Sequence, residues 1–116
     1  MTFNNEAIII KMHDNPTSRD FISLLPITLS MSDYNRTEKI SYLPRKLSSQ
    51  DAPSGSNPSA GDFTYYAPWG NLAIFYRGFG YSNGLIIMGR IDSGLEKLSG
   101  MNEDFEARLE VITSAE

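Results

Sequence analysis

The sequence predicts a mostly β (α+β) protein, a closed antiparallel β-barrel with two short capping helices. About seven short runs of β-branched and aromatic residues alternate with turn residues, which is typical of strands. Only two segments have the apolar spacing of a helix, too few for one crossover per strand, so a parallel sheet is disfavoured. Because 116 residues suffice for one hydrophobic core, we expect a single domain over residues 1–116.

The N-terminal half predicts strands on both sides of a short helix. The β-branched run Ala7–Met12 predicts the first of these strands. A capping residue followed by Pro16 starts the helix, which has one apolar face and ends before Pro26. Alternation over Ile27–Met31 predicts a strand with one buried face, a polar turn follows, and Ile40–Tyr42 continues as a short extended stretch.

The C-terminal half has the stronger β signal. The segment Ser48–Ala60 is rich in Ser and has no periodic apolar residue, so it predicts a long loop. Three β-branched and aromatic runs then predict three strands: Phe63–Tyr66, Leu72–Tyr76 and Leu85–Ile91. The second run is apolar on both faces, so we expect it to be covered on both sides. A short helix between Asp92 and Gly100 and an alternating strand over Phe105–Val111 complete the chain.

Composition excludes several classes of site. The chain has no Cys and one His, which excludes disulfide scaffolds, thiol nucleophiles, thiolate zinc sites and multi-histidine metal sites. A net charge of −4 argues against a nucleic-acid-binding or anionic-membrane surface. No apolar run is long enough for a signal sequence or a membrane span. We therefore expect a cytoplasmic protein with no metal, no cofactor, no nucleic acid and no membrane partner.

Several stretches of the chain resemble a known family. They are Asp14–Phe21 with Leu24-Leu25-Pro26, Leu43–Leu47, the most specific stretch Gly61–Tyr76, and Met88–Ile91. Together they resemble the bacterial cyclophilin-like domain family of small uncharacterised proteins, and the resemblance covers nearly the whole chain. It implies a cyclophilin-like barrel with a helix at each end, which agrees with the pattern of strands and helices.

True cyclophilins are prolyl isomerases, and the resemblance allows their working residues to be compared. Cyclophilins place an Arg from a Phe-His-Arg segment near the prolyl bond, with a Gln just before Gly-Gly-Asp-Phe. The matching segments here read Ser41-Tyr42-Leu43-Pro44-Arg45 and Ser59-Ala60-Gly61-Asp62, so the Phe-His, the Gln and the double Gly are missing. We therefore predict no catalytic residue. A reduced isomerase that uses Arg45 to weaken amide resonance is kept as an alternative.

Aromatic residues crowd between Tyr65 and Tyr81 and indicate a ligand cleft. Alternation in a small barrel buries about half of such residues as core, which is the competing interpretation. Trp69 lies on a predicted turn, where burial does not follow from the strand pattern. We predict a ligand-binding rim that consists of Arg45, Tyr66, Trp69 and Asn71. For Arg45, a solvated surface position is the simpler interpretation.

The expected function is that of a non-catalytic binding module whose cleft accepts a small molecule or a peptide segment. The family resemblance also implies a flavodoxin-like partner, because such domains occur joined to or beside flavodoxin-like domains. The third alternative is a structural domain that forms homo-oligomers. Relatives carry a longer strand before a turn like Asn4-Asn5, and this chain has only Met1–Phe3 there, which would leave a barrel edge open for pairing.

Overall fold

The computed structural model describes residues 1–112, so the expected domain end at residue 116 lies outside the described part. The helices are α1 (Pro16–Ile22) and α2 (Leu95–Ser99). The strands are β1 (Thr2–Phe3), β2 (Glu6–Ala7), β3 (Ile9–Met12), β4 (Ile27–Tyr34), β5 (Glu38–Tyr42), β6 (Gly55–Ser56), β7 (Asp62–Tyr66), β8 (Asn71–Phe75), β9 (Ser82–Asn83), β10 (Leu85–Ser93) and β11 (Phe105–Leu109).

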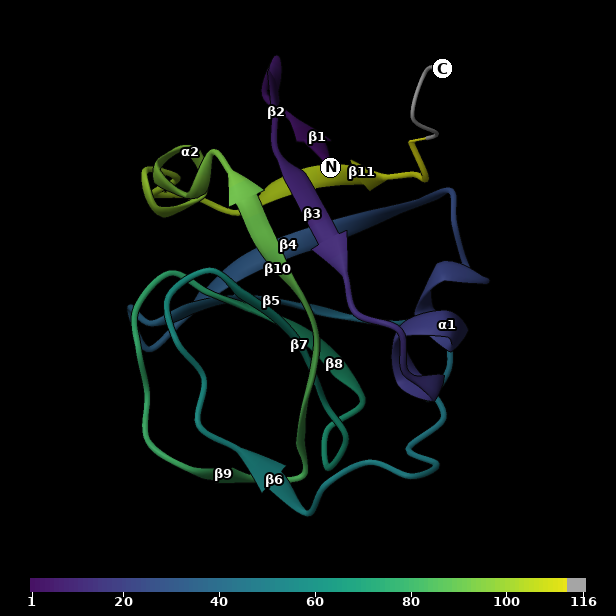
Figure 1. Ribbon diagram of the computed structural model, residues 1–116. Coiled ribbons are helices and arrows are strands. Elements are labelled where there is room, and N and C mark those ends of the chain that lie inside the picture. The colour runs from purple at the N-terminus through teal and green to yellow at the C-terminus, as the bar shows by residue number, and fades with distance from the viewer. Residues whose placement is uncertain (113–116) are drawn as a thin grey trace.

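Nine of these strands form one antiparallel sheet that curls into a nearly closed barrel. Their order is β2-β1-β11-β4-β5-β8-β7-β10-β3, while β6 and β9 pair separately. Helices α1 and α2 lie on opposite sides of the strands, and the β6–β9 pair lies away from the main sheet (Figure 1). The mostly β antiparallel barrel with two short helices expected from the sequence is therefore confirmed.

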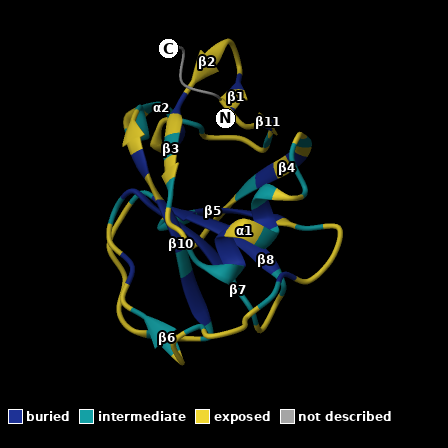
Figure 2. Cartoon of the chain, turned by 45° about the vertical axis from the view of Figure 1, so that its right-hand side comes forward, coloured by how far each residue is buried: buried dark blue, intermediate teal, exposed yellow. Residues whose placement is uncertain are grey.

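The barrel interior holds the main hydrophobic core. Strand alternation turns Phe63, Leu72 and Ile74 inward, where they are fully buried. From α1, Phe21 packs edge-on against Phe63 with 5.4 Å between ring centroids, and Leu98 of α2 is also buried in this core. Buried residues concentrate on the central strands, while the turn of the β1–β2 hairpin and β2 itself are exposed (Figure 2). All five residues of β8 are buried, as the two-faced apolar pattern predicted.

A second, smaller cluster lies on the outer face of the same strands. It consists of Ile40, Ala73, Phe75 and Leu85, with Tyr66 packed against it. The segment after β8 folds over part of this face, since the Phe79 ring stacks on Phe75 at 6.5 Å between centroids. Backbone hydrogen bonds from Phe79 to Pro58 and from Gly84 to Ser54 hold that segment to the 54–58 loop. The outer face therefore has its own apolar layer.

The structure differs from the sequence prediction in the length of β4 and in the run Ala7–Met12. Strand β4 continues to Tyr34, beyond the expected end at Met31, because the tight turn begins only at Asn35. Asn35 and Arg36 both adopt positive φ, and the Asp33 carboxylate accepts a hydrogen bond from the Arg36 backbone at 3.0 Å. The run expected as one strand over Ala7–Met12 is divided into β2 and β3, which pair with different neighbours, β1 and β10.

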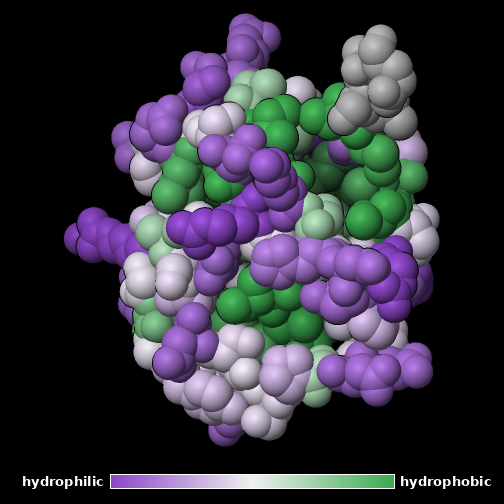
Figure 3. All heavy atoms as spheres, viewed as in Figure 1, coloured by the Kyte–Doolittle hydropathy of each residue, from purple (hydrophilic) through white to green (hydrophobic). Residues whose placement is uncertain are grey.

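The barrel opens between β3 and the end of β11. Strand β3 pairs only with β10 among residues 1–112, and a groove of about 480 Å³ lies beside it. Its lining is mostly apolar and includes Met1, Ile10 and Leu109. Apolar surface gathers at the upper right of the molecule, near the described end of the chain (Figure 3). The groove at the barrel opening is therefore an apolar surface rather than a polar site.

At one position, Gly89, the backbones of neighbouring strands lie too close together for any residue with a Cβ to fit without a shift. At Gly89, where β10 pairs with both β3 and β7, an added Cβ would lie 2.5 Å from the Lys11 carbonyl oxygen. We expect Gly89→Ala to lower the free energy of unfolding by about 1–3 kcal/mol, because the strands must separate to accept the methyl group. Urea denaturation measures the change.

The matched control for this substitution is Gly80→Ala. An added Cβ at Gly80 meets no atom within 4 Å, so we expect a change within about 0.5 kcal/mol. Equal stability of the two variants would contradict the close packing of β3 on β10.

Candidate functional site

Antiparallel register gathers the side chains of a candidate site on the outer face of the sheet. Residues opposite each other in an antiparallel pair point to the same face. Tyr34 lies opposite Glu38, and Glu38 lies opposite Phe75. Four residues earlier on β8, Asn71 lies opposite Tyr66, and Tyr66 lies opposite Leu85. Strands β4, β5, β8, β7 and β10 therefore contribute to one surface.

These side chains surround a pocket of about 200 Å³, which we call the outer-face pocket. Its buried residues are Ile40, Asn71, Phe75 and Leu85. Three aromatic residues also line it and are far more exposed: Trp69 at 49%, Phe79 at 50% and Tyr34 at 42%. The outer-face pocket therefore has an apolar floor and an aromatic rim that is open to solvent.

Trp69 and two tyrosines form a corner of that rim. The Trp69 ring lies 5.7 Å from Tyr34 and 5.4 Å from Tyr66, with interplanar angles of 83° and 79°. Such edge-to-face contacts are favourable and restrict the rings. Trp69 is presented by the turn between β7 and β8, whose backbone bonds join Trp69 and Gly70 to the Tyr66 carbonyl. The rim is consequently held in place although it is exposed.

Glu38 is the ionisable group with the most altered acidity in the outer-face pocket. Burial, together with the negative charge of Asp33 as the smaller cause, raises the pKa of Glu38 to about 7. The carboxyl is therefore present in both protonation states near neutral pH. A carboxyl of this kind suits either general acid–base chemistry or recognition of a charged or hydrogen-bonding ligand.

The neighbouring charges on the inner face are fully partnered, in contrast to Glu38. Lys39 is buried, donates to the Met101 carbonyl at 2.7 Å, and lies 3.2 Å from the Asp33 carboxylate. Burial alone would raise the pKa of Asp33, but hydrogen bonds from Tyr76 and Lys39 outweigh it and lower that pKa. Burial and the Asp33 hydrogen bond raise the pKa of Tyr76 to about 12. This cluster stabilises one end of the barrel.

Asn71 is a second polar residue of the outer-face pocket, and its side-chain oxygen lacks a hydrogen-bond donor among the described residues. Its side chain is 1% exposed, and its Nδ2 donates to the Leu72 carbonyl at 3.0 Å. Its Oδ1 is buried and accepts no hydrogen bond from the described residues. A buried acceptor without a donor costs roughly 1–3 kcal/mol, so it is commonly found where a ligand or an ordered water completes it.

Three of the four residues predicted for the ligand rim lie together. Tyr66, Trp69 and Asn71 all line the outer-face pocket, whereas Arg45 does not. Arg45 instead pairs with Asp20 of α1, with its two terminal nitrogens 3.0 and 2.7 Å from the carboxylate oxygens.

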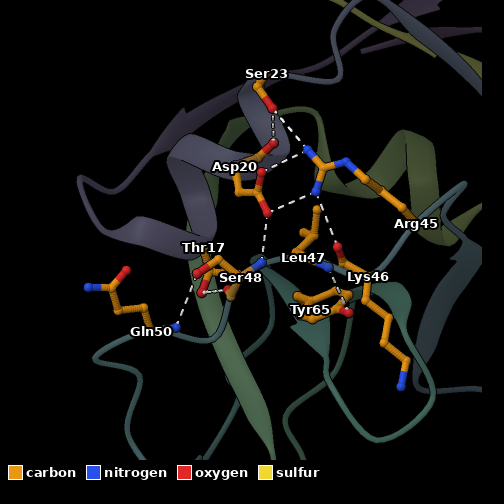
Figure 4. Close-up of polar contacts among 9 residues, drawn as sticks. All are labelled: Thr17, Asp20, Ser23, Arg45, Lys46, Leu47, Ser48, Gln50 and Tyr65. Atoms are coloured by element: carbon orange, nitrogen blue, oxygen red, sulfur yellow. Dashed lines mark hydrogen bonds and ion pairs between the residues drawn. The ribbon is translucent and has the colours of Figure 1, made fainter.

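The Arg45 side chain points toward α1 and ties it to the segment after β5 (Figure 4). Its guanidinium also donates to the Ser23 hydroxyl and to the Lys46 carbonyl, each at 3.2 Å. The Asp20 carboxylate accepts a further bond from the Ser48 backbone at 2.7 Å. The hydrogen bond from Arg45, followed by that from Ser48, lowers the pKa of Asp20. This contact serves the packing of α1.

Sequence reasoning missed several residues of the outer-face pocket, Glu38 foremost. Glu38 falls in a polar stretch after a turn, and nothing local distinguishes it from a solvated acid. The relevant signal is the alternation within each strand, which puts Glu38 and Ile40 on one face of β5 and puts Asn71 and Phe75 on one face of β8. That alternation becomes informative only once the register between the two strands is known.

Among residues 1–112, no three His, Cys, Asp or Glu side chains come together in a group that could hold a metal ion. Within the same range, no helix is both long enough and apolar enough to cross a lipid bilayer.

Replacing Glu38 tests the altered acidity through stability. A carboxyl whose folded pKa is raised binds its proton more tightly when folded, so the free energy of unfolding falls as pH rises from 4.5 to about 7. Each pKa unit corresponds to about 1.4 kcal/mol, and partial exposure of Glu38 reduces the sum to about 2 kcal/mol. We expect Glu38→Gln to lose this fall, as measured by urea denaturation across that range.

The matched control for this experiment is Glu103→Gln, an exposed residue between α2 and β11. It should follow the pH dependence of the unaltered protein. The lowered pKa values of Asp20 and Asp33 act below the chosen range, since those groups lose stability only as pH falls below about 4. Parallel curves for Glu38→Gln and the unaltered protein would contradict the account of Glu38.

Comparisons with known proteins place this barrel in a family. The model of the "Cyclophilin-like family" matches residues 1–110. The solution structure of a hypothetical protein from Archaeoglobus fulgidus is similar, with a TM-score of 0.66 and 17% identity over 93% of this chain and 88% of that chain. At this identity the likeness shows the fold alone. No curated protein matches the sequence. Because the family model spans nearly its whole length, the chain belongs to the cyclophilin-like family.

Proposed function

We propose that this protein is a non-catalytic binding module that holds a small organic molecule, or a single side chain of a peptide, in the outer-face pocket. The observation that carries the proposal is that Asn71, a residue that lines this pocket, has a buried Oδ1 without a donor among the described residues. An ionisable carboxyl and an exposed aromatic rim belong to the same pocket. A single bound ligand would contact the rim, pair with the carboxyl and supply the missing hydrogen bond.

The size of the outer-face pocket favours a small ligand. Pockets for drug-sized molecules measure roughly 300–1,000 Å³, whereas this one measures about 200 Å³. A nucleotide or a flavin would not fit inside it, but a headgroup or one side chain would. The groove at the barrel opening is larger, yet its only charged lining side chains in the described chain are those of Lys11 and Glu110, which are exposed.

The reduced-isomerase alternative has less support. That mechanism needs a cation beside the prolyl amide, and no Arg or Lys is among the described residues that line the outer-face pocket. Arg45 forms a two-point ion pair with Asp20 and would have to break it to act elsewhere. Glu38 alone provides one acid–base group without a nucleophile beside it. Binding is thus the function that the geometry supports best.

A fragment screen tests the binding role. We expect several fragments from a mixed library of neutral, cationic and anionic compounds to shift the backbone amide signals of Asn71 and Phe75 in nitrogen-15 NMR spectra. The indole signal of Trp69, the single Trp of the chain, should shift with them. Shifts spread evenly over the surface, or confined to the groove beside β3, would contradict the proposal.

A matched pair of variants on β9 sharpens this test. Ser82 lines the outer-face pocket, and its neighbour Asn83 is exposed and does not line it. We expect Ser82→Phe to fill the pocket and weaken fragment binding at least about tenfold, which corresponds to about 1.4 kcal/mol. Asn83→Phe should bind fragments as the unaltered protein does. Equal binding by both variants would place the ligand elsewhere.

A further inference from the structure

We propose that the ligand group held in the outer-face pocket is a small organic cation, an alkylammonium. This inference rests on the proposed function and specifies its ligand class. It follows from the electrostatic character of the lining, since every strong electrostatic feature among the described lining residues favours positive charge.

Aromatic rings supply the first of these features. Five rings line the outer-face pocket, from Tyr34, Tyr66, Trp69, Phe75 and Phe79. The faces of such rings carry partial negative charge and attract ammonium groups, most strongly when the cation is removed from water. The near-perpendicular arrangement of Trp69 against both tyrosines presents ring surfaces in different directions around one volume. A rounded cation contacts such surfaces better than a flat ligand does.

Two oxygen acceptors supply the second feature. The Glu38 carboxyl carries a full negative charge once it is ionised, and Asn71 Oδ1 is a buried acceptor without a donor in the described chain. Both favour a ligand that brings donors or positively polarised methyl groups. An anionic ligand would meet repulsion from the same groups. An uncharged apolar ligand would leave the acceptor unsatisfied.

No positive charge of the protein offsets these groups inside the pocket, because no Lys, Arg or His is among the described lining residues. The nearest lysine in sequence, Lys39, points to the opposite face and pairs with Asp33. Asp33 itself repels the ionised form of Glu38. A bound cation would relieve that repulsion, so binding and ionisation of Glu38 support each other.

The surroundings of Glu38 determine how binding depends on pH. From β4, Asp33 and Tyr34 lie next to it, and Arg36 in the following turn bonds to Asp33 through its backbone. From β8, the facing residue is the uncharged Phe75, and across the pocket lies Tyr66. Near neutral pH the titrating group is therefore Glu38. We expect cation affinity to fall as pH drops from 8 to 5.5, with proton release on binding at pH 7.

Three compounds of closely similar shape separate charge from shape. Choline, 3,3-dimethyl-1-butanol and 3,3-dimethylbutanoate share a branched, trimethyl-substituted end and carry positive, zero and negative charge. We expect choline to bind at least about tenfold more tightly than the neutral alcohol at pH 8. The anion should bind more weakly than either. Nitrogen-15 NMR titration gives the dissociation constants, and calorimetry in two buffers gives the proton release.

Two variants assign the preference to particular groups. Glu38→Gln should reduce the preference for choline over the alcohol severalfold and remove the pH dependence, because the ring faces remain but the charge is lost. Trp69→Leu should weaken the binding of choline more than it weakens the binding of the alcohol. The matched control is Tyr42→Leu, an aromatic residue on the same face that is 63% exposed and does not line the pocket. It should change neither affinity.

The outcomes distinguish this inference from the proposed function. Equal or tighter binding of the alcohol or the anion at the outer-face pocket would overturn the cation and leave the binding role standing. If none of the three compounds binds while library fragments do, the cation is likewise overturned. If neither the compounds nor any fragment shifts the pocket signals, both proposals fail. Tight choline binding that Glu38→Gln and Trp69→Leu both weaken supports the inference.

Discussion

Antiparallel register across five neighbouring strands is the constraint on which both the core and the pocket depend. Register fixes which residues share a face, and a slip of one residue would exchange the two faces of a strand. With the observed pairing, Leu72 and Ile74 enter the barrel core while Asn71 and Phe75 face outward. The strands therefore bury both faces, the inner one as the core of the barrel and the outer one as the floor of a site.

Strand β5 shows how one strand can serve stability on one face and recognition on the other. Lys39 turns inward and satisfies its charge with Asp33 and the Met101 carbonyl, so its burial is compensated. Glu38, the adjacent residue, turns outward among aromatic rings, where burial without a cation raises its pKa to about 7. A fold rarely leaves such groups uncompensated without a functional reason. This contrast between Lys39 and Glu38 points to the outer face, rather than the inner one, as the location of a binding site.

Much of the fold could be predicted from the sequence, because short β runs, turn residues and two helical segments are local signals. The two-sided burial of β8 and the helix start at Pro16 are examples. The candidate site was harder to predict, because Glu38 and Tyr66 come together only through two strand pairings that local sequence patterns do not fix. Arg45 shows the opposite problem. The resemblance of its segment to the Arg-bearing segment of cyclophilins suggested the cleft, but Asp20 of α1, 25 residues away in sequence, binds it.

Strand register holds an ionisable carboxyl, that of Glu38, inside an aromatic pocket. Carbon-13 NMR titration of the Glu38 side-chain carboxyl in the free protein tests this placement. We expect a titration midpoint near pH 7, because the carboxyl is buried beside Asp33. A midpoint at the ordinary value of 4.5 would show a solvated side chain and contradict the placement of Glu38 in the pocket.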